Sequence, residues 1–249
     1  MILNENIFMS TKTLAKELTL YSGPLSLFGA KVDIALREKG VPFNVVMVAF
    51  SEAEGYSPKH ETVMRINPKH QVPVLIHHGV ELFDSTQIFE YLDDTFPEPP
   101  LWPRERVTRA KARQLELIAD EFYFAQVIKL FSLQNEREGP LAQAAYEVMR
   151  QYHQTVEQKL SQSPFLVGAF SYADIGFFMA LLFGDRMGCA LDKRTPKLMA
   201  WRTHMAARPS IQESLKPMKA YLASVSRYFP SWVYGEAREG VQTPNENRP

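Results

Sequence analysis

Residues 71–85 read QVPVLIHHGVELFDS, and this stretch decides the fold. Two apolar, β-branched runs, PVLIH and VELF, flank the pair His78-Gly79, which is typical of a tight turn. The pattern predicts a β-hairpin. Pro73 opens the first run, and because proline cannot donate to a sheet ladder it is confined to strand starts, edges or bulges. The hairpin is therefore entered through an unusual Val72-Pro73 step.

The segments around this hairpin alternate between strand and helix patterns. LTLY (18–21) and FNVVMV (43–48) predict strands, and SLFGAKVDIALREKG (26–40) between them has the spacing of a helix that stops at Gly40. A short helix is indicated over 60–66, and Ser85 opens another helix after the hairpin. A strand-helix-strand unit followed by a hairpin predicts a mixed sheet covered by helices.

Beyond residue 97 the strand signals fade. PEPPLWPRE (97–105) carries four prolines and is the natural linker, and helical patterns follow at 105–134, 140–162, 172–187, 196–207 and 210–224. The predicted organisation is a flexible N-terminal arm at 1–17, an α/β unit at 18–97, a linker at 98–105, a helical unit at 106–228 and a C-terminal tail at 229–249.

The composition favours a cytoplasmic protein. The 249 residues hold 28 Lys plus Arg and 28 Asp plus Glu, so no net field points to nucleic acid or to a membrane surface as a partner. The single cysteine, Cys189, excludes an intrachain disulfide and fits a reducing compartment. The first residues lack the pattern of a secretory signal, and the longest apolar run, near 175–183, is too short to span a bilayer. The six histidines show no metal-ligand spacing, so no metal is predicted.

Four stretches carry a family resemblance. LYSGPLSLFGAKVDIALREKG, INPKHQVPVL, ELFDSTQIFEYLDDTFP and FLVGAFSYADIGFF, in this order and spacing, resemble the cytosolic glutathione transferases over residues 18–225. The chain looks most similar to the serine-type classes, including the bacterial branch that holds the β-aryl-etherases. The resemblance implies a thioredoxin-like N-terminal domain, an all-α C-terminal domain, a homodimer, and glutathione as co-substrate for a hydrophobic electrophile.

The same resemblance implies where glutathione binds. In this family the bond before the proline is cis, which turns the Val72 N–H and C=O out of the ladder to pair with the tripeptide as an added strand would. Gln71 is expected near the tripeptide backbone. Ser85 and the helix N-terminus would hold the γ-glutamyl carboxylate, and Asp84 would accept from the α-ammonium. The plainer alternatives are a trans turn at Pro73 and a simple N-cap role for Ser85.

Two departures from the family pattern affect this site. Asp84 stands where relatives usually carry the longer Glu, and His70 replaces a frequent glycine. For the glycyl carboxylate the sequence offers Lys59, His60 or Lys69 and does not choose between them.

The chemistry expected of such a site is the stabilisation of a thiolate, because a free thiol has a pKa of about 8.5 and is mostly protonated at neutral pH. Ser26 begins the helix after the first strand, where a hydroxyl donor is aided by the helix dipole, and it is the first candidate. Ser22 and Tyr21 are alternatives. In the plainest interpretation Ser26 is only an N-cap.

An apolar wall for the electrophile is expected between the two units. Candidates on the first long helix are Phe122, Tyr123, Phe124 and Val127, and Phe229, Trp232 and Tyr234 are candidates for a lid, although aromatic residues at helical spacing are more often plain core. Ser171 and Asp174 form the S-x-x-D pattern of a capping box, which predicts a structural role.

Three functions remain open at this stage. The leading hypothesis is a glutathione transferase. A second is a non-catalytic binding or regulatory protein of the same fold, like the stringent-starvation proteins, since a fold does not determine a function. A third is a glutathione-dependent lyase, isomerase or dehalogenase.

Overall fold

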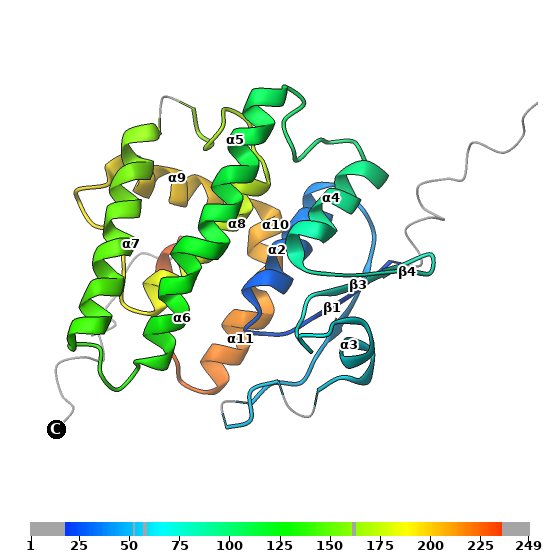
Figure 1. The fold of residues 1–249 in the computed structure, drawn as a ribbon, viewed down its shortest axis with the longest axis horizontal. Coiled ribbons are helices and arrows are strands. Elements are labelled where there is room, and N and C mark those ends of the chain that lie inside the picture. The colour runs from blue at the N-terminus through cyan, green and yellow to red at the C-terminus, as the bar shows by residue number, and fades with distance from the viewer. Residues whose placement is uncertain (1–17, 52, 57–58, 161–162, 236–249) are drawn as a thin grey trace, which may run out of the picture.

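The computed structural model describes residues 18–51, 53–56, 59–160 and 163–235. A four-stranded sheet with its helices lies beside a larger bundle of helices (Figure 1). This architecture confirms the predicted thioredoxin-like unit followed by an all-helical unit. The predicted arm at 1–17 and the tail from residue 236 onward lie outside the described residues.

The sheet has the strand order β2-β1-β3-β4. β1 (Thr19–Ser22) pairs in parallel with β2 (Asn44–Met47) and antiparallel with β3 (Val74–His77), and β4 (Val80–Phe83) closes the predicted hairpin. Tyr21 is the partner of Val74 in the register. Because the two strands run in opposite directions, the residue after Tyr21 lies beside Pro73. The end of β1 and the Val72-Pro73 step are thereby brought together.

The two faces of the sheet pack against different helices. Leu20 and Leu75 belong to the main core, which also contains the buried residues of α2 (Leu27–Glu38) and α4 (Ser85–Thr95). Val74 faces the other way and packs in a smaller cluster with Val63 of α3 (Glu61–Ile66). This alternation follows from the period of two along a strand.

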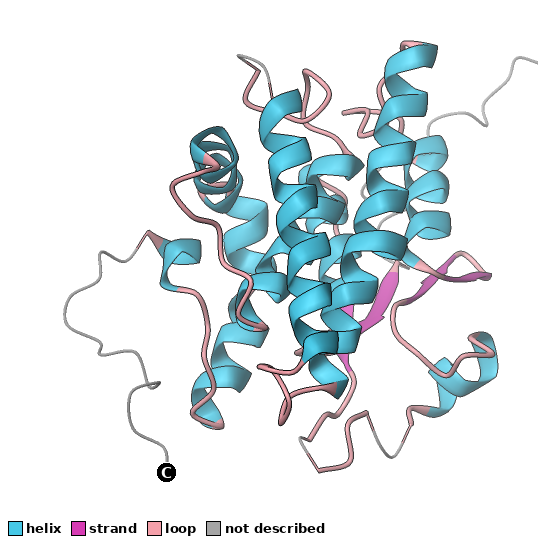
Figure 2. Cartoon of the chain, turned by 60° about the vertical axis from the view of Figure 1, so that its left-hand side comes forward, coloured by secondary structure: helices cyan, strands magenta, loops and turns pink. Residues whose placement is uncertain are grey.

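The helical bundle is built around one fully buried helix. Residues 172–185 of α8 (Tyr172–Arg186) are all buried, which matches an apolar pattern on every side. The other helices of this unit pack against α8 or against one another, and Figure 2 shows the strands beside the bundle. These helices are α5 (Arg106–Leu117), the π-helix η2 (Ile118–Tyr123), α6 (Phe124–Ser132), α7 (Pro140–Lys159), α9 (Pro196–Ala206), α10 (Pro209–Ser214), α11 (Lys216–Ser224) and the 3₁₀ turn η3 (Ser231–Tyr234).

Two predicted helices differ from the observed ones. The run at 105–134 is interrupted by a π-helical segment at Ile118–Tyr123, so the helical face shifts between α5 and α6. The run at 210–224 is divided at Leu215 into α10 and α11. Pro217 explains this break, because proline has no N–H for the interior of a helix and is tolerated only in its first turn.

The segment predicted as a linker, 98–105, is packed rather than loose at its centre. Leu101 and Trp102 are buried, and the indole ring of Trp102 lies 4.8 Å from the ring of Tyr172. The backbone carbonyl of Leu101 also accepts from the N–H of Tyr172. The segment between the two units is thus packed against the start of α8.

The capping box predicted at the start of α8 is confirmed. The carboxylate of Asp174 accepts from the backbone N–H of Ser171 at 3.0 Å. It also accepts from the indole N–H of Trp201 at 3.0 Å and from the N–H of Leu166 at 2.9 Å. Burial raises the pKa of Asp174 to about 6, in spite of these donors. The motif is structural, as expected.

A buried histidine lies in the bundle. His153 is 3% exposed, and its Nε2 is 2.7 Å from the hydroxyl of Tyr123. Burial lowers the pKa of His153 to about 4. The folded chain therefore favours the neutral imidazole. As the pH falls, His153 takes up its proton at a higher pH in the unfolded chain than in the folded chain.

This difference predicts a pH dependence of stability. The stabilisation by neutral His153 is complete above the ordinary histidine pKa of about 6.5 and is lost as the pH falls through that value toward 4. The shift corresponds to about 3 kcal/mol. We expect the difference in unfolding free energy between the wild type and His153→Gln to shrink by about that amount from pH 7.5 to pH 4 in urea titrations. A constant difference across this range would contradict the assignment.

Candidate functional site

The peptide before β3 is the first component of the site. The Val72-Pro73 bond is cis, as expected, and the sheet ladder begins only at Val74. Among the described residues, no backbone hydrogen bond partner is found for the N–H or the C=O of Val72. A donor and an acceptor are thus left unpaired at the entry to the strand, which is the arrangement that accepts an extended peptide.

Asn67 braces the turn that leads to this peptide. It is buried, its side-chain amide donates to the carbonyl of Gln71 at 2.6 Å, and its Oδ1 accepts from the N–H of Lys69 at 2.9 Å. His70, which departs from the glycine usual in the family, adopts the left-handed conformation with φ of 53°. The turn therefore forms with a histidine at this position. Asn67 was missed by sequence reasoning, because its role depends on the folded turn.

The start of α4 corrects one expectation. Asp84, and not Ser85, is the N-cap: its carboxylate Oδ1 accepts from the N–H of Thr86 at 3.0 Å and of Gln87 at 3.3 Å. Asp84 has a φ of 72°, and Asp is one of the residues that tolerate this conformation. Ser85 is the first helical residue and is buried. Its N–H and hydroxyl have no partner among the described residues, so they stay available to an anion.

Two serine hydroxyls converge at the start of α2. Ser26 is 8% exposed and caps the helix, with its Oγ accepting from the N–H of Gly29 at 2.9 Å. Ser22, at the end of β1, is also buried, and a Cβ at Gly29 would lie 2.1 Å from its Oγ. Only glycine permits this approach. Because Ser26 uses a lone pair for the cap, its own proton remains free for donation.

These hydroxyls line a cavity of about 160 Å³ between the two units. Ser22, Gly23, Pro24 and Ser26 form one side, and α10 and α11 close the other with residues such as Ser214 and Met218. None of the residues predicted to bind the tripeptide lines this cavity. The sheet register places Ser22 beside Pro73. The serine hydroxyls and the residues predicted to bind the tripeptide are therefore neighbours at the end of β1, but they do not line the same cavity.

Tyr21, the third candidate for the hydroxyl that stabilises the thiolate, lies on the other face of the sheet. The ring of Tyr21 packs on the α3 side of the sheet, 5.1 Å from the ring of His60. It therefore faces away from α2. His60 itself caps α3 by accepting from the N–H of Thr62 at 3.2 Å, whereas Lys59 and Lys69 are exposed. Of the three candidates for binding the glycyl carboxylate, only His60 is used in a helix cap, so the side chains of Lys59 and Lys69 fit that role better.

A second residue missed by sequence reasoning is Tyr56. Its hydroxyl accepts from the N–H of Leu25 at 3.1 Å, and its ring covers Gly23 so closely that a Cβ there would lie 2.2 Å away. Burial raises the pKa of Tyr56 well above its ordinary value, so the hydroxyl keeps its proton. Tyr56 is a further hydroxyl at the turn before α2, and the sequence around it contains no pattern that indicates this role.

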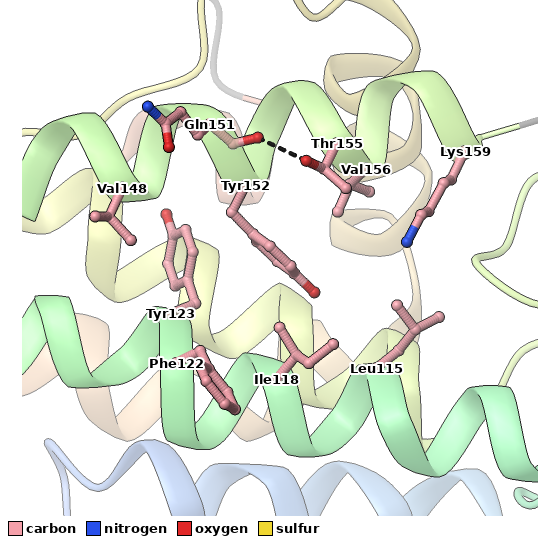
Figure 3. Close-up of a pocket in the computed structure, with 10 residues that line it drawn as sticks. All are labelled: Leu115, Ile118, Phe122, Tyr123, Val148, Gln151, Tyr152, Thr155, Val156 and Lys159. Carbon is pink, nitrogen blue, oxygen red and sulfur yellow. Dashed lines mark hydrogen bonds between the residues drawn. The ribbon is translucent and has the colours of Figure 1, made fainter.

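The residues predicted for the electrophile pocket are not brought together between the units. Phe122 is 62% exposed, and Phe122 and Tyr123 line a cavity between η2 and α7 (Figure 3). Val127 is buried in the core. The aromatic residue that contacts α2 is Phe124, whose ring lies 5.3 Å from that of Phe28 in an edge-to-face contact. Phe122 and Phe124 are two residues apart and therefore lie on different sides of the helix.

The predicted lid residues are part of the helical unit. The indole N–H of Trp232 donates to Oδ2 of Asp185 at 2.9 Å, and the hydroxyl of Tyr234 donates to the carbonyl of Gln212 at 3.2 Å. Phe229 packs with Tyr234 at 5.9 Å between ring centroids. These contacts hold η3 against α8 and α10, so the described part of the tail does not cover the hydroxyls of α2.

A buried ion cluster joins α2 to the helical unit. Lys31 has no exposed surface, and its Nζ lies 2.7 Å from Glu116 and 2.5 Å from Asp120. Thr86, in the first turn of α4, donates to Glu116 at 2.9 Å. Burial alone would lower the pKa of Lys31, but the two carboxylates outweigh it and raise the pKa. The cluster holds α2 and α4, whose N-terminal turns form the site, against α5 and η2.

Metal clusters and membrane-spanning helices are both absent from the described residues. No group of three or more His, Cys, Asp or Glu side chains within the described ranges is arranged to hold a metal ion. In the same part of the chain, no helix combines the length and the apolar character that crossing a membrane requires.

Comparison with known proteins gives consistent results for both units. Residues 16–94 match the model for the glutathione S-transferase N-terminal domain, and residues 118–209 match that for the C-terminal domain. Glutathione S-transferase U19 of Arabidopsis thaliana is 30% identical over 228 residues, which are 88% of this chain and 99% of the relative. A stringent starvation protein A homolog of Coxiella burnetii is 38% identical over 112 residues, 45% of this chain and 51% of the relative.

A solved structure extends the comparison to three dimensions. A glutathione S-transferase from Methylobacterium radiotolerans, crystallised in complex with glutathione sulfonate, matches with a TM-score of 0.67 and 27% identity. The match covers 80% of this chain and 94% of that chain. The similarity therefore includes both units and their relative placement.

Proposed function

Because the chain belongs to the glutathione S-transferase family, we propose that it binds glutathione and holds the sulfur as a thiolate for attack on a hydrophobic electrophile. The observation that carries this proposal is the unpaired peptide of Val72 beside the end of β1, where the hydroxyls of Ser22 and Ser26 lie. Binding of glutathione sulfonate by a structural neighbour supports the choice of ligand.

The tripeptide is bound through its backbone and its charged ends. The cysteinyl peptide of glutathione pairs with the N–H and C=O of Val72, with Gln71 alongside. The γ-glutamyl carboxylate takes the N–H and hydroxyl of Ser85 at the start of α4, where the helix dipole favours an anion. The second oxygen of Asp84 accepts from the α-ammonium. Lys59 or Lys69 neutralises the glycyl carboxylate.

The chemical step uses the hydroxyl of Ser26. The thiol loses its proton to solvent, and the resulting thiolate accepts a hydrogen bond from Ser26 at the positive end of α2. The sulfur lone pair then forms a carbon–sulfur bond, and the leaving group departs with the bonding electrons. Ser22 is the second candidate for the donor, and Tyr56 has a hydroxyl at the same turn.

The electrophile is assigned to the apolar contact between the units. Phe28 of α2, two residues after Ser26, and Phe124 of α6 meet there. This placement is better supported than a wall made of Phe122 and Tyr123, because those two residues line the cavity between η2 and α7. Substrate profiling is the experiment that identifies the class of electrophile. It also distinguishes a transferase from a glutathione-dependent lyase, isomerase or dehalogenase.

The proposal includes a homodimer and a cytoplasmic location, both expected from the family resemblance and the composition. The first helices of the helical unit carry large apolar side chains that are mostly exposed in the single chain. They are Ile128 (54%), Phe131 (61%) and Leu141 (70%). Apolar groups of this size on one region of the surface are typical of an interface.

A non-catalytic role is the second candidate. The observation in its favour is the match to a stringent starvation protein A homolog, which is higher in identity than the transferase match but covers half of that relative. In that case the fold would serve as a binding module, without thiolate chemistry.

Retention on immobilised glutathione distinguishes the two. The wild type is expected to be retained and then eluted by free glutathione, and to conjugate glutathione to an activated aryl halide. Ser85→Ala is expected to bind about 10- to 150-fold more weakly, because a charge-assisted hydrogen bond is worth about 1.5–3 kcal/mol. A matched control is Ser224→Ala, a hydroxyl on the last turn of α11. Absence of both retention and conjugation would favour the non-catalytic role.

A further inference from the structure

Arg186, in the last turn of α8, is a partly buried cation without a counter-ion. Within the described residues its guanidinium makes no hydrogen bond and no ion pair, and its Nε–H is fully buried without a partner. Other buried or partly buried arginines of this unit lie near carboxylates: Arg208 is 2.6 Å from Glu38, and Arg202 is 3.8 Å from Asp185. Burying a charge without a partner costs free energy, so Arg186 requires an explanation that the fold alone does not supply.

The charge of Arg186 is not offset by its neighbours. Burial lowers the pKa of Arg186 to about 10, and no nearby charged group opposes this effect. The guanidinium nevertheless stays protonated at neutral pH. The adjacent carboxylate, Asp185, is turned away, because it accepts from the hydroxyl of Tyr228 at 3.0 Å and from the indole N–H of Trp232 at 2.9 Å. An anionic group that reached Arg186 would therefore meet a cation to which no carboxylate of the described residues is bound.

Three aromatic rings connect Arg186 to the hydroxyl that is proposed to hold the thiolate. The guanidinium carbon of Arg186 lies 5.1 Å from the centroid of the Phe183 ring, and that ring lies 5.9 Å from the ring of Phe124. The ring of Phe124 lies 5.3 Å from that of Phe28, two residues after Ser26. The rings come from α8, α6 and α2, and thus from both units. An apolar body that lay along them would extend from Ser26 toward Arg186.

Two local effects also favour a cation at this position. The last turn of a helix carries a partial negative charge, and the face of the Phe183 ring attracts a guanidinium. Neither effect supplies an acceptor for the N–H groups, which lie in the plane of the guanidinium. This planar fork has the geometry that forms two parallel hydrogen bonds with a carboxylate.

Resting on the proposed function, we propose that Arg186 binds a carboxylate of the electrophile. The substrate class is then an extended aryl electrophile with an anionic group at the end remote from the reacting carbon. Its apolar body lies along the three rings, and its reacting carbon faces the thiolate held by Ser26. The alternative partner of Arg186 is a carboxylate of residues 236–249, which lie outside the described residues. The ring contacts favour the substrate, because they join the cation to the hydroxyl that the chemistry uses.

Conjugation of two matched electrophiles tests the proposal. The anionic probe is a chlorodinitrophenyl ring that carries a benzoate para to the chlorine, and the neutral probe is the methyl ester of that benzoate. With both probes the glutathione thiolate forms a carbon–sulfur bond, and chloride leaves with the bonding electrons. Arg186→Met is expected to raise the KM of the anionic probe about ten- to a hundredfold with little change in kcat, because the lost hydrogen bonds to a charged group hold ground and transition states equally. The KM and kcat of the methyl ester should not change.

Further measurements separate substrate binding from a structural role. Arg186→Lys keeps the charge but lacks the fork, and is expected to raise the KM of the anionic probe by a smaller factor. Arg106→Met, the same charge change at the exposed start of α5, is the matched control and should leave both probes unaffected. In urea unfolding, Arg186→Met is expected to be at least as stable as the wild type, because it removes a buried cation that has no counter-ion.

The results distinguish a failure of this proposal from a failure of the proposed function. An unchanged KM for the anionic probe in Arg186→Met, an equal rise for both probes, or failure of the wild type to conjugate the anionic probe would overturn the proposal. A clear loss of stability in Arg186→Met would also overturn it, because the partner of the cation would then be a carboxylate of the chain itself. Absence of retention of the wild type on immobilised glutathione is the result that would overturn the proposed function, and this proposal with it.

Discussion

Replacement of Ser26 by alanine is expected to raise the pKa of the bound glutathione thiol by about one to two units. A hydrogen bond to a charged group is worth about 1.5–3 kcal/mol, and one pKa unit corresponds to about 1.4 kcal/mol. Below the wild-type pKa this shift lowers the thiolate fraction, and with it the conjugation rate, by about ten- to a hundredfold, and the factor is smaller where the wild-type thiol is already ionised. The measurement is the ultraviolet absorbance of the thiolate in the binary complex as a function of pH.

Two further variants separate the chemical role of Ser26 from its structural one. Ser26→Thr keeps both the helix cap and the hydroxyl and is expected to retain thiolate formation. Ser26→Ala also loses the cap, which costs about 1 kcal/mol of stability and is measured separately in urea. Ser22→Ala is the matched control for the loss of a neighbouring buried hydroxyl. Loss of the thiolate in Ser22→Ala, with Ser26→Ala unaffected, would move the donor to Ser22.

Replacement of Lys31 by methionine is expected to destabilise the fold by about 3–5 kcal/mol. Lys31 is fully buried and is the counter-ion that both Glu116 and Asp120 contact. Its removal leaves two buried carboxylates without a cation, which is the costly way to break a buried pair. Because burial already raises the pKa of Asp120 to about 6, proton uptake relieves part of this loss in mild acid. Urea unfolding at pH 7.5 and pH 5 measures both effects.

The controls for this prediction come from the same chain. Arg65→Met removes the exposed ion pair of Arg65 with Glu81 and is expected to have little effect, because water screens that pair. A triple variant that also carries Glu116→Gln and Asp120→Asn removes every charge of the cluster and is expected to recover part of the stability. If Lys31→Met were as stable as Arg65→Met, the cluster would not join the two units in the way described.

The features that could be predicted from the sequence are those decided by local chemistry. The hairpin around His78-Gly79 follows from turn residues between β-branched runs, and the capping box of Ser171 and Asp174 follows from the spacing of two side chains. The position of Ser26 at the start of α2 follows from the helical period that comes after it. Each of these needs only a few neighbouring residues.

The features that could not be predicted depend on distant contacts. Lys31 is separated from Glu116 by 85 residues, and Tyr56 from Leu25 by 31, so no local pattern indicates either contact. The cap of α4 was assigned to Ser85 because serine is a strong N-cap, but Asp84 is equally suited and holds the positive φ at the corner. The placement of Phe122 and Tyr123 beside α7 depends on the π-helical segment at 118–123, which no sequence pattern indicates.

The most direct test of the central claim is a crystal structure of the chain with glutathione. We expect the cysteinyl backbone to lie antiparallel to Val72, with N–H to oxygen bonds of about 2.9 Å, and the sulfur within hydrogen-bond reach of Ser26 Oγ. Glutathione bound elsewhere, or a sulfur that contacts neither Ser26 nor Ser22, would contradict the account.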